Sequence, residues 1–374
     1  MRIMISCGEA SGDLYAGALA AELRARVPSV EIGGFGGPRL KAAGATLTGD
    51  FTGLTVTGLT EIIRVLPQSW RMYRRLVQEA RTHRPDVFVA IDFSGFNFHL
   101  IRALRQLGVT IVYYVSPQLW AWRQRRIETM KRFVDKVLVI FPFEAPVYER
   151  AGIPVEFVGH PLVDIARATR SRSGFLSALG LRADAPTVAL LPGSRPNELR
   201  RIAPDMAASV PLIRASVPEA QFVVARAPNL PDELFAPFGS DAVVVEDCTD
   251  DVLAASDVVV TASGTATVQA ALHEKPMVVV YRLSSMTYRL GKPFVHVDMY
   301  AMVNLVAGRR IVPELIQDDF TAGRVAEETV ALLTDAERHM RTREALRSVR
   351  AQLGDPGASG RAADAILAMA VRGV

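Results

Sequence analysis

Short apolar segments alternate along the chain with longer amphipathic segments. Short runs of aliphatic and β-branched residues are typical of buried strands, and the segments between them have the apolar spacing of helices. Strands that alternate with helices indicate a parallel, doubly wound sheet. The first series of predicted strands covers residues 2–7, 31–37, 87–93, 110–115, 136–141 and 155–159.

A second series of apolar strands begins after a polar stretch, residues 159–181, and indicates a second α/β domain. We therefore expect domains over 1–165 and 166–342, with ligands bound in a cleft at the carboxyl ends of the strands. The final helical stretch is broken by "GDPGASG", and its last part, 343–374, could pack back on the first domain. The second series of strands covers 187–194, 221–227, 242–247, 258–264 and 277–282.

The chain has 374 residues, 49% of them apolar and 22% charged, as expected for a globular protein long enough for two domains. The formal net charge of +4 comes mostly from arginine, which suits anionic ligands or an anionic surface. Cys7 and Cys248 lie on different predicted strands, which indicates buried free thiols in a reducing compartment. No secretion signal or long uncharged apolar run occurs, so we expect a cytoplasmic protein that does not span a membrane.

The motif "GEASGD", residues 8–13, joins the first predicted strand to an Ala- and Leu-rich helix. Gly8 and Gly12 would let a ligand approach the backbone at the N-terminus of that helix. The spacing is not that of a dinucleotide fingerprint, and the carboxylates of Glu9 and Asp13 would repel a phosphate. Sugar hydroxyl groups are therefore the better ligand, and for Asp13 a helix-capping role stays equally open.

Two loops of the second domain have the features of a phosphate site. Residues 263–265, Ser-Gly-Thr, follow an apolar strand and begin a helix without an acidic side chain. Residues 193–195, Gly-Ser-Arg, also follow a strand and add a guanidinium. Together the loops predict a diphosphate cradle without a metal, because Arg195 and the helix dipoles can neutralise a leaving nucleoside diphosphate.

Asp92 follows a strand of the first domain, where a carboxylate can take a proton from an attacking hydroxyl. The commoner role of such an aspartate is an Asx-turn or a helix cap. His99 is expected to be a packing residue, and His160, in a Gly-His-Pro turn, is expected to face the cleft. The sequence has no zinc-ligand spacing, Walker sequence or G-x-S-x-G, so we expect no metal, no cofactor and no nucleic-acid partner.

Residues 61–84 combine apolar positions with several arginines. This pattern is typical of a helix in a membrane interface and of an amphipathic helix on a sheet, and by itself it favours the sheet. Residues 120–133 add a basic stretch with two tryptophans, which could bind phosphate or form a solvated face.

Several motifs, taken in order from near residue 5 to near residue 320, resemble those of the lipid-A-disaccharide synthases, which are GT-B glycosyltransferases of family 19. The set is far more specific than any single loop. The motifs are "GEASGD", "YYVSPQLWAWRQRR", "FPFE", "FVGHPL", "LLPGSRPNE", "SGTAT", "VVVYR" and "NLVAGRRIVPELIQ".

The resemblance implies the GT-B architecture, in which two Rossmann-like, doubly wound parallel-sheet domains face a central cleft. The activity implied is inverting transfer from UDP-2,3-diacylglucosamine to 2,3-diacylglucosamine 1-phosphate, giving the β-1,6-linked lipid A disaccharide 1-phosphate and UDP. The first domain would bind the acceptor and the membrane, and the second would bind the UDP-sugar. The implied location is the inner face of the bacterial inner membrane, as a peripheral enzyme of lipopolysaccharide biosynthesis.

The resemblance also implies roles for individual residues. Inversion needs a base for the acceptor 6-hydroxyl, and the implied base is Asp92, with Glu9 as the alternative. Arg195 resembles the arginine that contacts the leaving diphosphate. The other implied donor residues are Gly193, Ser194, Ser263, Gly264, Thr265, Gln269, Asn304, Glu314 and Gln317, and the acceptor-side residues are Ser11, Gly12, Asn97 and His160.

Two positions depart from the family pattern. Gln269 stands where many members have Glu, so it brings no charge to the ribose contact implied there. Gly95 stands where many members have Asp, which leaves Asp92 as the only carboxylate of its motif.

Both implied substrates carry acyl chains, and exposing them to water costs about 0.8 kcal/mol per methylene. The resemblance therefore favours residues 61–84 as a membrane-docking surface and acyl groove, whose arginines meet anionic headgroups. The residues implied for this surface are Ile63, Leu66, Trp70 and Tyr73.

Three other interpretations remain open. Another GT-B protein, such as a sugar-nucleotide epimerase or a water-soluble glycosyltransferase, would show no lipid dependence. A peripheral membrane module would bind nucleotide or anionic lipid without turnover. A dinucleotide oxidoreductase is disfavoured, because the first strand-to-helix turn lacks the required glycine spacing and carries acids.

Overall fold

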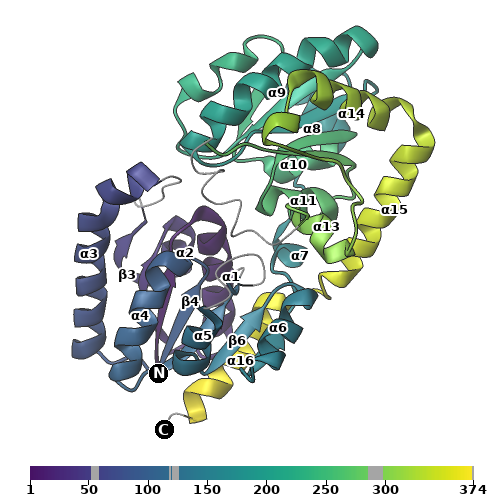
Figure 1. Ribbon diagram of the computed structural model, residues 1–374. Coiled ribbons are helices and arrows are strands. Elements are labelled where there is room, and N and C mark those ends of the chain that lie inside the picture. The colour runs from purple at the N-terminus through teal and green to yellow at the C-terminus, as the bar shows by residue number, and fades with distance from the viewer. Residues whose placement is uncertain (52–58, 118, 120–125, 285–297, 373–374) are drawn as a thin grey trace. The chain divides into compact units, whose positions relative to one another are not determined.

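The computed structural model describes residues 1–51, 59–117, 119, 126–284 and 298–372, except for the side chains of 59–65 and 371–372. The chain divides into two compact units (Figure 1). The first holds Met1–Asp164 and the segment from Leu353 onward, and the second holds the described residues from Ile165 to Gln352. The prediction from the sequence ends the first domain at residue 165 and returns the chain to that domain from residue 343.

A parallel sheet forms the centre of the first unit. Its strand order among the described residues is β3-β2-β1-β4-β5-β6-β7, so the order reverses at β1, between β2 and β4. This order is that of a doubly wound fold. The strands are β1 (Arg2–Cys7), β2 (Glu31–Gly36), β3 (Thr46–Asp50), β4 (Val87–Ile91), β5 (Thr110–Tyr114), β6 (Lys136–Val139) and β7 (Val155–Phe157).

Helices α3, α4 and α5 pack on this sheet through a core that includes Leu76, Leu104 and Met130. Helix α1 packs against α2 and against α16, which comes from the C-terminal end of the chain (Figure 1). The Asp164 carboxylate accepts hydrogen bonds from the main-chain N–H of Ala358 (3.1 Å) and the preceding residue, and so caps α16. The helices are α1 (Ala10–Arg26), α2 (Pro38–Ala42), α3 (Leu59–Thr82), α4 (Ser94–Gln106), α5 (Ile127–Phe133), α6 (Ala145–Arg150), α7 (Leu162–Ile165) and α16 (Ala358–Arg372).

The second unit repeats this plan. Its described strands follow the order β10-β9-β8-β11-β12-β13, and one face of the sheet is covered by α9 and α14 through a core that includes Met206 and Leu332. The strands are β8 (Thr187–Leu191), β9 (Gln221–Arg226), β10 (Val243–Glu246), β11 (Val258–Ala262), β12 (Met277–Tyr281) and β13 (Glu314–Ile316). The helices are α8 (Arg172–Ala178), α9 (Pro196–Ser216), α10 (Thr249–Ala255), α11 (Thr265–Leu272), α13 (Met302–Ala307), α14 (Ala322–Thr334) and α15 (Ala336–Gln352).

The predicted fold class, α/β with two doubly wound parallel sheets, is confirmed. Two short edge strands, β3 and β13, were not predicted from their hydrophobic pattern. Cys7 is buried at the end of β1, but the expectation for Cys248 is wrong: it follows β10, is half-buried and lies next to the start of α10.

Candidate functional site

The carboxyl ends of β1 and β4 meet where the strand order of the first sheet reverses. Ligands of doubly wound folds bind at such a point. The loop after β1 carries Gly8 and Glu9, and the loop after β4 carries Asp92 and Phe93. A Cβ on Gly8 would lie 2.2 Å from Cγ of Phe93, so the two loops touch and only glycine fits. The structure thus brings the opening motif and Asp92 to one edge of the sheet.

The Asp13 carboxylate caps a neighbouring helix. It accepts hydrogen bonds from the main-chain N–H groups of Gly37 (2.7 Å), Arg39 (2.8 Å) and Leu40 (3.1 Å), at the start of α2. Of the two roles that the sequence left open, the structure supports a cap, although on α2 and not on its own helix. Of the other predicted residues in this turn, Glu9 and Ser11 are half-buried and Gly12 is buried.

The backbone of Asp92 is held in the left-handed region, with φ 42°. This conformation is uncommon for a residue with a side chain. The main-chain oxygen of Asp92 accepts hydrogen bonds from Nδ2 of Asn97 (2.9 Å) and from the hydroxyl of Tyr113 (2.7 Å). Oδ1 of the fully buried Asn97 accepts from the Ser6 hydroxyl (2.7 Å), so this amide ties the end of β4 to β1.

Tyr113 lies beside Asp92 and Arg126 lies beside Ser94, and neither residue was singled out from the sequence. Burial raises the pKa of Tyr113, and the Asp92 carboxylate raises it further, whereas Arg126 opposes the shift. Tyr113 therefore keeps its proton and can donate it in a hydrogen bond. The Arg126 guanidinium lies 4.8 Å from the ring centre of Phe98 and 3.4 Å from the Ser94 hydroxyl. Both residues belong to the motif "YYVSPQLWAWRQRR".

His160 is only 1% exposed. Its ring contacts those of Tyr15 and Phe141, and its Nδ1 accepts a hydrogen bond from the main-chain N–H of Leu162 (3.2 Å). Burial lowers the pKa of His160 to about 3, so the imidazole is neutral. His99 was expected to pack in the core, and this expectation is wrong because its side chain is exposed on α4.

The two predicted phosphate loops of the second unit lie side by side. β8 and β11 are neighbours at the reversal point of this sheet, and a Cβ on Gly193 would lie 3.8 Å from Cβ of Ala262, at the end of β11. Helices α9 and α11 both begin at this edge, and the N-terminus of a helix favours an anion, although Pro196, the first residue of α9, has no N–H to donate. Nη1 of Arg195 pairs with Oε1 of Glu198 (2.9 Å), and Ser194 is exposed.

Three residues that are predicted to bind the UDP-sugar donor, Ser263, Asn304 and Glu314, meet in one hydrogen-bond network. The Ser263 hydroxyl donates to the main-chain oxygen of Tyr300 (3.1 Å). The Glu314 carboxylate accepts from the main-chain N–H groups of Tyr300 (3.1 Å) and Ala301 (2.8 Å), at the start of α13. Asn304 is fully buried and donates to Oε1 of Glu314 (2.8 Å). The contacts of Glu314 and Asn304 therefore hold the chain around α13 in place.

Gln317 and Gln269, which are also predicted to bind the UDP-sugar donor, form hydrogen bonds within the chain. Oε1 of Gln317 accepts a hydrogen bond from the main-chain N–H of Leu283 (2.5 Å). Gln269 is half-buried on α11, and its Nε2 lies 3.5 Å from Oδ1 of Asp250, which also contacts Nε2 of His273 (2.9 Å). No motif in the sequence pointed to Asp250.

Helix α3 presents apolar side chains to solvent. Leu66 is 54% and Trp70 61% exposed, and the Trp70 ring stacks on Tyr73 with centres 5.1 Å apart. The helix is anchored further along by the buried Leu76 and Val77. The side chain of Ile63 and the whole of residues 120–125 lie outside the described part of the chain.

None of the described helices has an apolar stretch long enough to cross a bilayer. Likewise, no three His, Cys, Asp or Glu side chains of the described residues gather as a metal site would require.

Comparison with known proteins identifies the family. A family model described as lipid-A-disaccharide synthetase matches residues 3–369. The lipid-A-disaccharide synthases of Geobacter sulfurreducens and Myxococcus xanthus are each 41% identical to this chain, over 372 and 370 residues, covering 98% of it and 97% of each relative.

Two solved structures share the fold. The UDP-GlcNAc 2-epimerase from Neisseria meningitidis has a TM-score of 0.70 at 12% identity, with 98% of this chain and 100% of that one covered. The calicheamicin glycosyltransferase CalG4 has a TM-score of 0.63 at 17% identity, with 99% and 98% covered. These two support the GT-B architecture alone. The family model and the two sequence relatives go further, and they show that the chain belongs to the lipid-A-disaccharide synthetase family.

Proposed function

We propose that this protein transfers a diacylglucosamine unit from its UDP-linked donor to diacylglucosamine 1-phosphate, with inversion, and releases UDP. The observation that carries this proposal is the family match over nearly the whole chain. Its support in the structure is the chemistry at the two strand-order reversal points. One carries the carboxylates of Glu9 and Asp92, and the other carries Arg195 and two helix N-termini.

The loops after β8 and β11 bind the diphosphate of the donor in this proposal. Arg195 and the N-terminal ends of α9 and α11 face negative charge that grows as the bond from the anomeric carbon to UDP breaks. Ser194, Ser263, Gly264 and Thr265 hold phosphate oxygens. Glu314, Asn304 and Gln317 support this site by fixing the chain around α13 and β12, and Gln269 accepts or donates a hydrogen bond at the ribose.

Asp92 acts as the base in the first unit. Its carboxylate takes the proton of the acceptor 6-hydroxyl while that oxygen forms the new bond to the anomeric carbon and UDP leaves from the opposite side. Glu9, on the adjoining loop, is the alternative base. Ser11 and Gly12 line the acceptor side, whereas Asn97 and His160 are buried and act by positioning the loops.

The surface formed by Leu66, Trp70 and Tyr73 docks on the membrane and receives acyl chains. Its exposed apolar side chains are flanked by the exposed Arg71 and Arg74, which can meet anionic headgroups. The protein would then work as a peripheral enzyme on the inner face of the bacterial inner membrane.

The deciding experiment is mass spectrometry of the products formed from the paired lipid substrates. The expected product is a disaccharide 1-phosphate, formed in step with UDP release. Asp92→Asn should abolish most of the turnover, whereas Asp86→Asn should not, because Asp86 lies at the other end of β4 and binds the main-chain N–H of Arg2 (2.7 Å). UDP release without a disaccharide, or epimerisation of the donor alone, would refute the proposal.

A further inference from the structure

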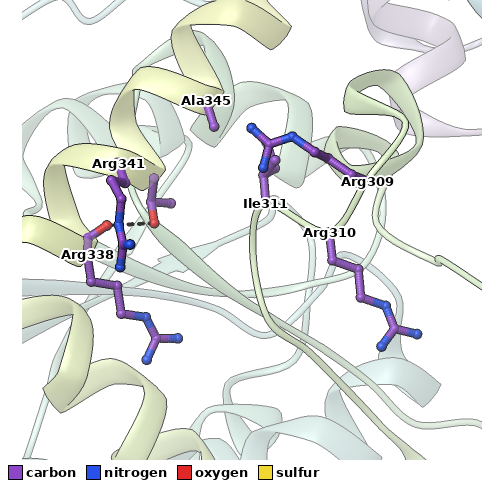
Figure 2. A pocket seen from close by; sticks show the side chains of 7 residues that line it. Arg309, Arg310, Ile311, Arg338, Arg341 and Ala345 are labelled. Atoms are coloured by element: carbon purple, nitrogen blue, oxygen red, sulfur yellow. Dashed lines mark hydrogen bonds between the residues drawn. The ribbon is translucent and has the colours of Figure 1, made fainter.

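A hollow lined by arginines lies in the second unit, between the end of α13 and the start of α15. Its volume is about 300 Å³. Arg309 and Arg310 follow the end of α13, and Arg338 and Arg341 project from the first turns of α15 (Figure 2). We call this the arginine hollow. It lies at the C-terminal end of α13, about 9 Å along the helix axis from the network at Tyr300.

The positive charge of this hollow is only partly balanced. Arg338 pairs with Glu328, and Nη1 of Arg341 lies 3.6 Å from Glu337 on an exposed turn. Arg310 donates to the main-chain oxygen of Asp298 (2.9 Å), which leaves its charge uncompensated. Among the described side chains, no carboxylate forms an ion pair with Arg309 or Arg310. Of the described residues that line the adjoining hollow, Glu344 is the one acid.

Three other arginines of α15 are arranged differently. Arg343, Arg347 and Arg350 converge on the Glu274 carboxylate, at 3.5, 3.0 and 3.4 Å. These contacts hold the pKa of Glu274 below its usual value, chiefly through the hydrogen bond from Arg347. The arginines on this face of α15 therefore share one carboxylate of the chain, whereas Arg309 and Arg310 pair with none among the described side chains.

We propose that the arginine hollow binds a phosphate-bearing anion at a site separate from the donor and acceptor loops. Guanidinium groups bind phosphate through paired N–H···O bonds, and Arg309 extends toward Ala345 on α15, the helix that carries Arg338 and Arg341 (Figure 2). The volume lies at the lower end of the range for small-molecule sites, which suits a diphosphate or a phosphorylated headgroup. The phosphate can belong to a free solute or to a lipid.

The first test is calorimetric titration of the full-length protein with inorganic pyrophosphate, with UDP present to occupy the donor loops. The variant Arg309→Gln with Arg341→Gln should weaken pyrophosphate binding about tenfold. The matched control, Arg343→Gln with Arg350→Gln, removes the same charge from α15 and its surroundings and leaves Arg347 on Glu274, so binding should stay within about twofold of wild type.

The second test is flotation with phosphatidylcholine vesicles that contain or lack phosphatidylglycerol. If the hollow takes a lipid phosphate, the phosphatidylglycerol-dependent part of binding should fall in the first variant and not in the control. A loss in the titration alone identifies a free phosphate, and a loss in flotation alone identifies a headgroup. If neither assay separates the variant from its control, the proposal is wrong. Because Arg195 and Asp92 are intact in all variants, failure of the glycosyl-transfer proposal would not produce this result.

Discussion

The side-chain amide of Asn97 donates a 2.9 Å hydrogen bond to the main-chain oxygen of Asp92. The Tyr113 hydroxyl donates a second, at 2.7 Å, to the same oxygen. Because Asp92 has φ 42°, its backbone lies in a region that costs of the order of 1–3 kcal/mol unless the surroundings compensate. The two donors supply that compensation, and they set the direction in which the Asp92 side chain leaves the backbone.

Removing one of these two hydrogen-bond donors should lower turnover clearly and lower the stability of the fold only slightly. We expect Tyr113→Phe to reduce kcat about tenfold with little change in KM for the donor, because the base shifts while the phosphate loops do not. The stability loss should be about 1 kcal/mol, as for one buried hydrogen bond. Steady-state kinetics and urea unfolding measure both. Tyr148→Phe is the matched control, since its buried hydroxyl lies 3.4 Å from the main-chain oxygen of Pro117. Equal kinetic losses in both variants would mean that Tyr113 has no positioning role.

Gly8 should tolerate no side chain. A Cβ there would lie 2.2 Å from the Phe93 ring, so Gly8→Ala must displace Phe93 and with it the neighbouring Asp92. We expect a stability loss of about 1–3 kcal/mol and a clear loss of activity. Gly95→Ala, on α4, is the control, because a Cβ at Gly95 meets nothing within 4 Å. Alanine in a helix should keep or slightly raise the melting temperature. Normal activity of Gly8→Ala would contradict the observed contact.

Arg195 should matter for the chemical step. Arg195→Ala is expected to lower kcat/KM by two to three orders of magnitude, roughly the cost of removing one donor to transition-state charge. Arg200→Ala provides the comparison, since Arg200 is exposed on α9 and donates to Oδ1 of Asn197 (3.0 Å). UDP release at varied donor concentration gives both values. If the two variants differ by less than about tenfold, Arg195 does not have the role proposed here.

The hydrophobic pattern predicted most strands because a buried parallel strand is a local apolar run. The edge strand β3, "TLTGD", has no such run, since it is largely polar and, among the described strands, pairs with β2 alone. β13 has only three residues, too few for any periodicity. The expectation for Cys248 failed because the apolar residues of β10 end at Val245, three residues before the cysteine.

Positions at strand ends were predictable for the same local reason, and Asp92 and Arg195 both follow strands as expected. The hydrogen-bond partners of site residues were not predictable in this way. The Ser6 partner of Asn97 comes from another strand, and the α2 partners of Asp13 come from beyond the next strand. Such pairings depend on the order of strands in the sheet, which a single sequence does not encode as a local pattern.

The exposed apolar side chains of α3 should drive membrane binding. Leu66→Ser with Trp70→Ser removes two side chains whose full burial is worth about 1.5–3 kcal/mol each. With partial insertion, affinity for phosphatidylglycerol vesicles should fall roughly 30- to 100-fold, while far-ultraviolet circular dichroism stays unchanged. Leu212→Ser is the control, because Leu212 is also exposed, at 46%, but lies on α9 in the second unit. Vesicle binding that survives the double substitution would place the docking surface elsewhere.

The buried His160 should make the protein less stable in mild acid. Its pKa is about 3 in the folded chain against 6.5 when exposed, so the unfolded chain binds the extra proton first as the pH falls. The stability that depends on neutral His160 is complete above pH 6.5 and is lost as the pH falls toward 3. Between pH 7.5 and pH 5 this loss should be about 2 kcal/mol.

Urea unfolding at these two pH values measures the loss. His160→Asn keeps an acceptor for the Leu162 N–H but cannot titrate, so it should remove about 2 kcal/mol of the difference between the two pH values. His83→Asn is the matched control, because the His83 side chain is 51% exposed beside Glu79 and is not enclosed as His160 is. A pH dependence that persists undiminished in His160→Asn would show that the imidazole is not held neutral by its surroundings.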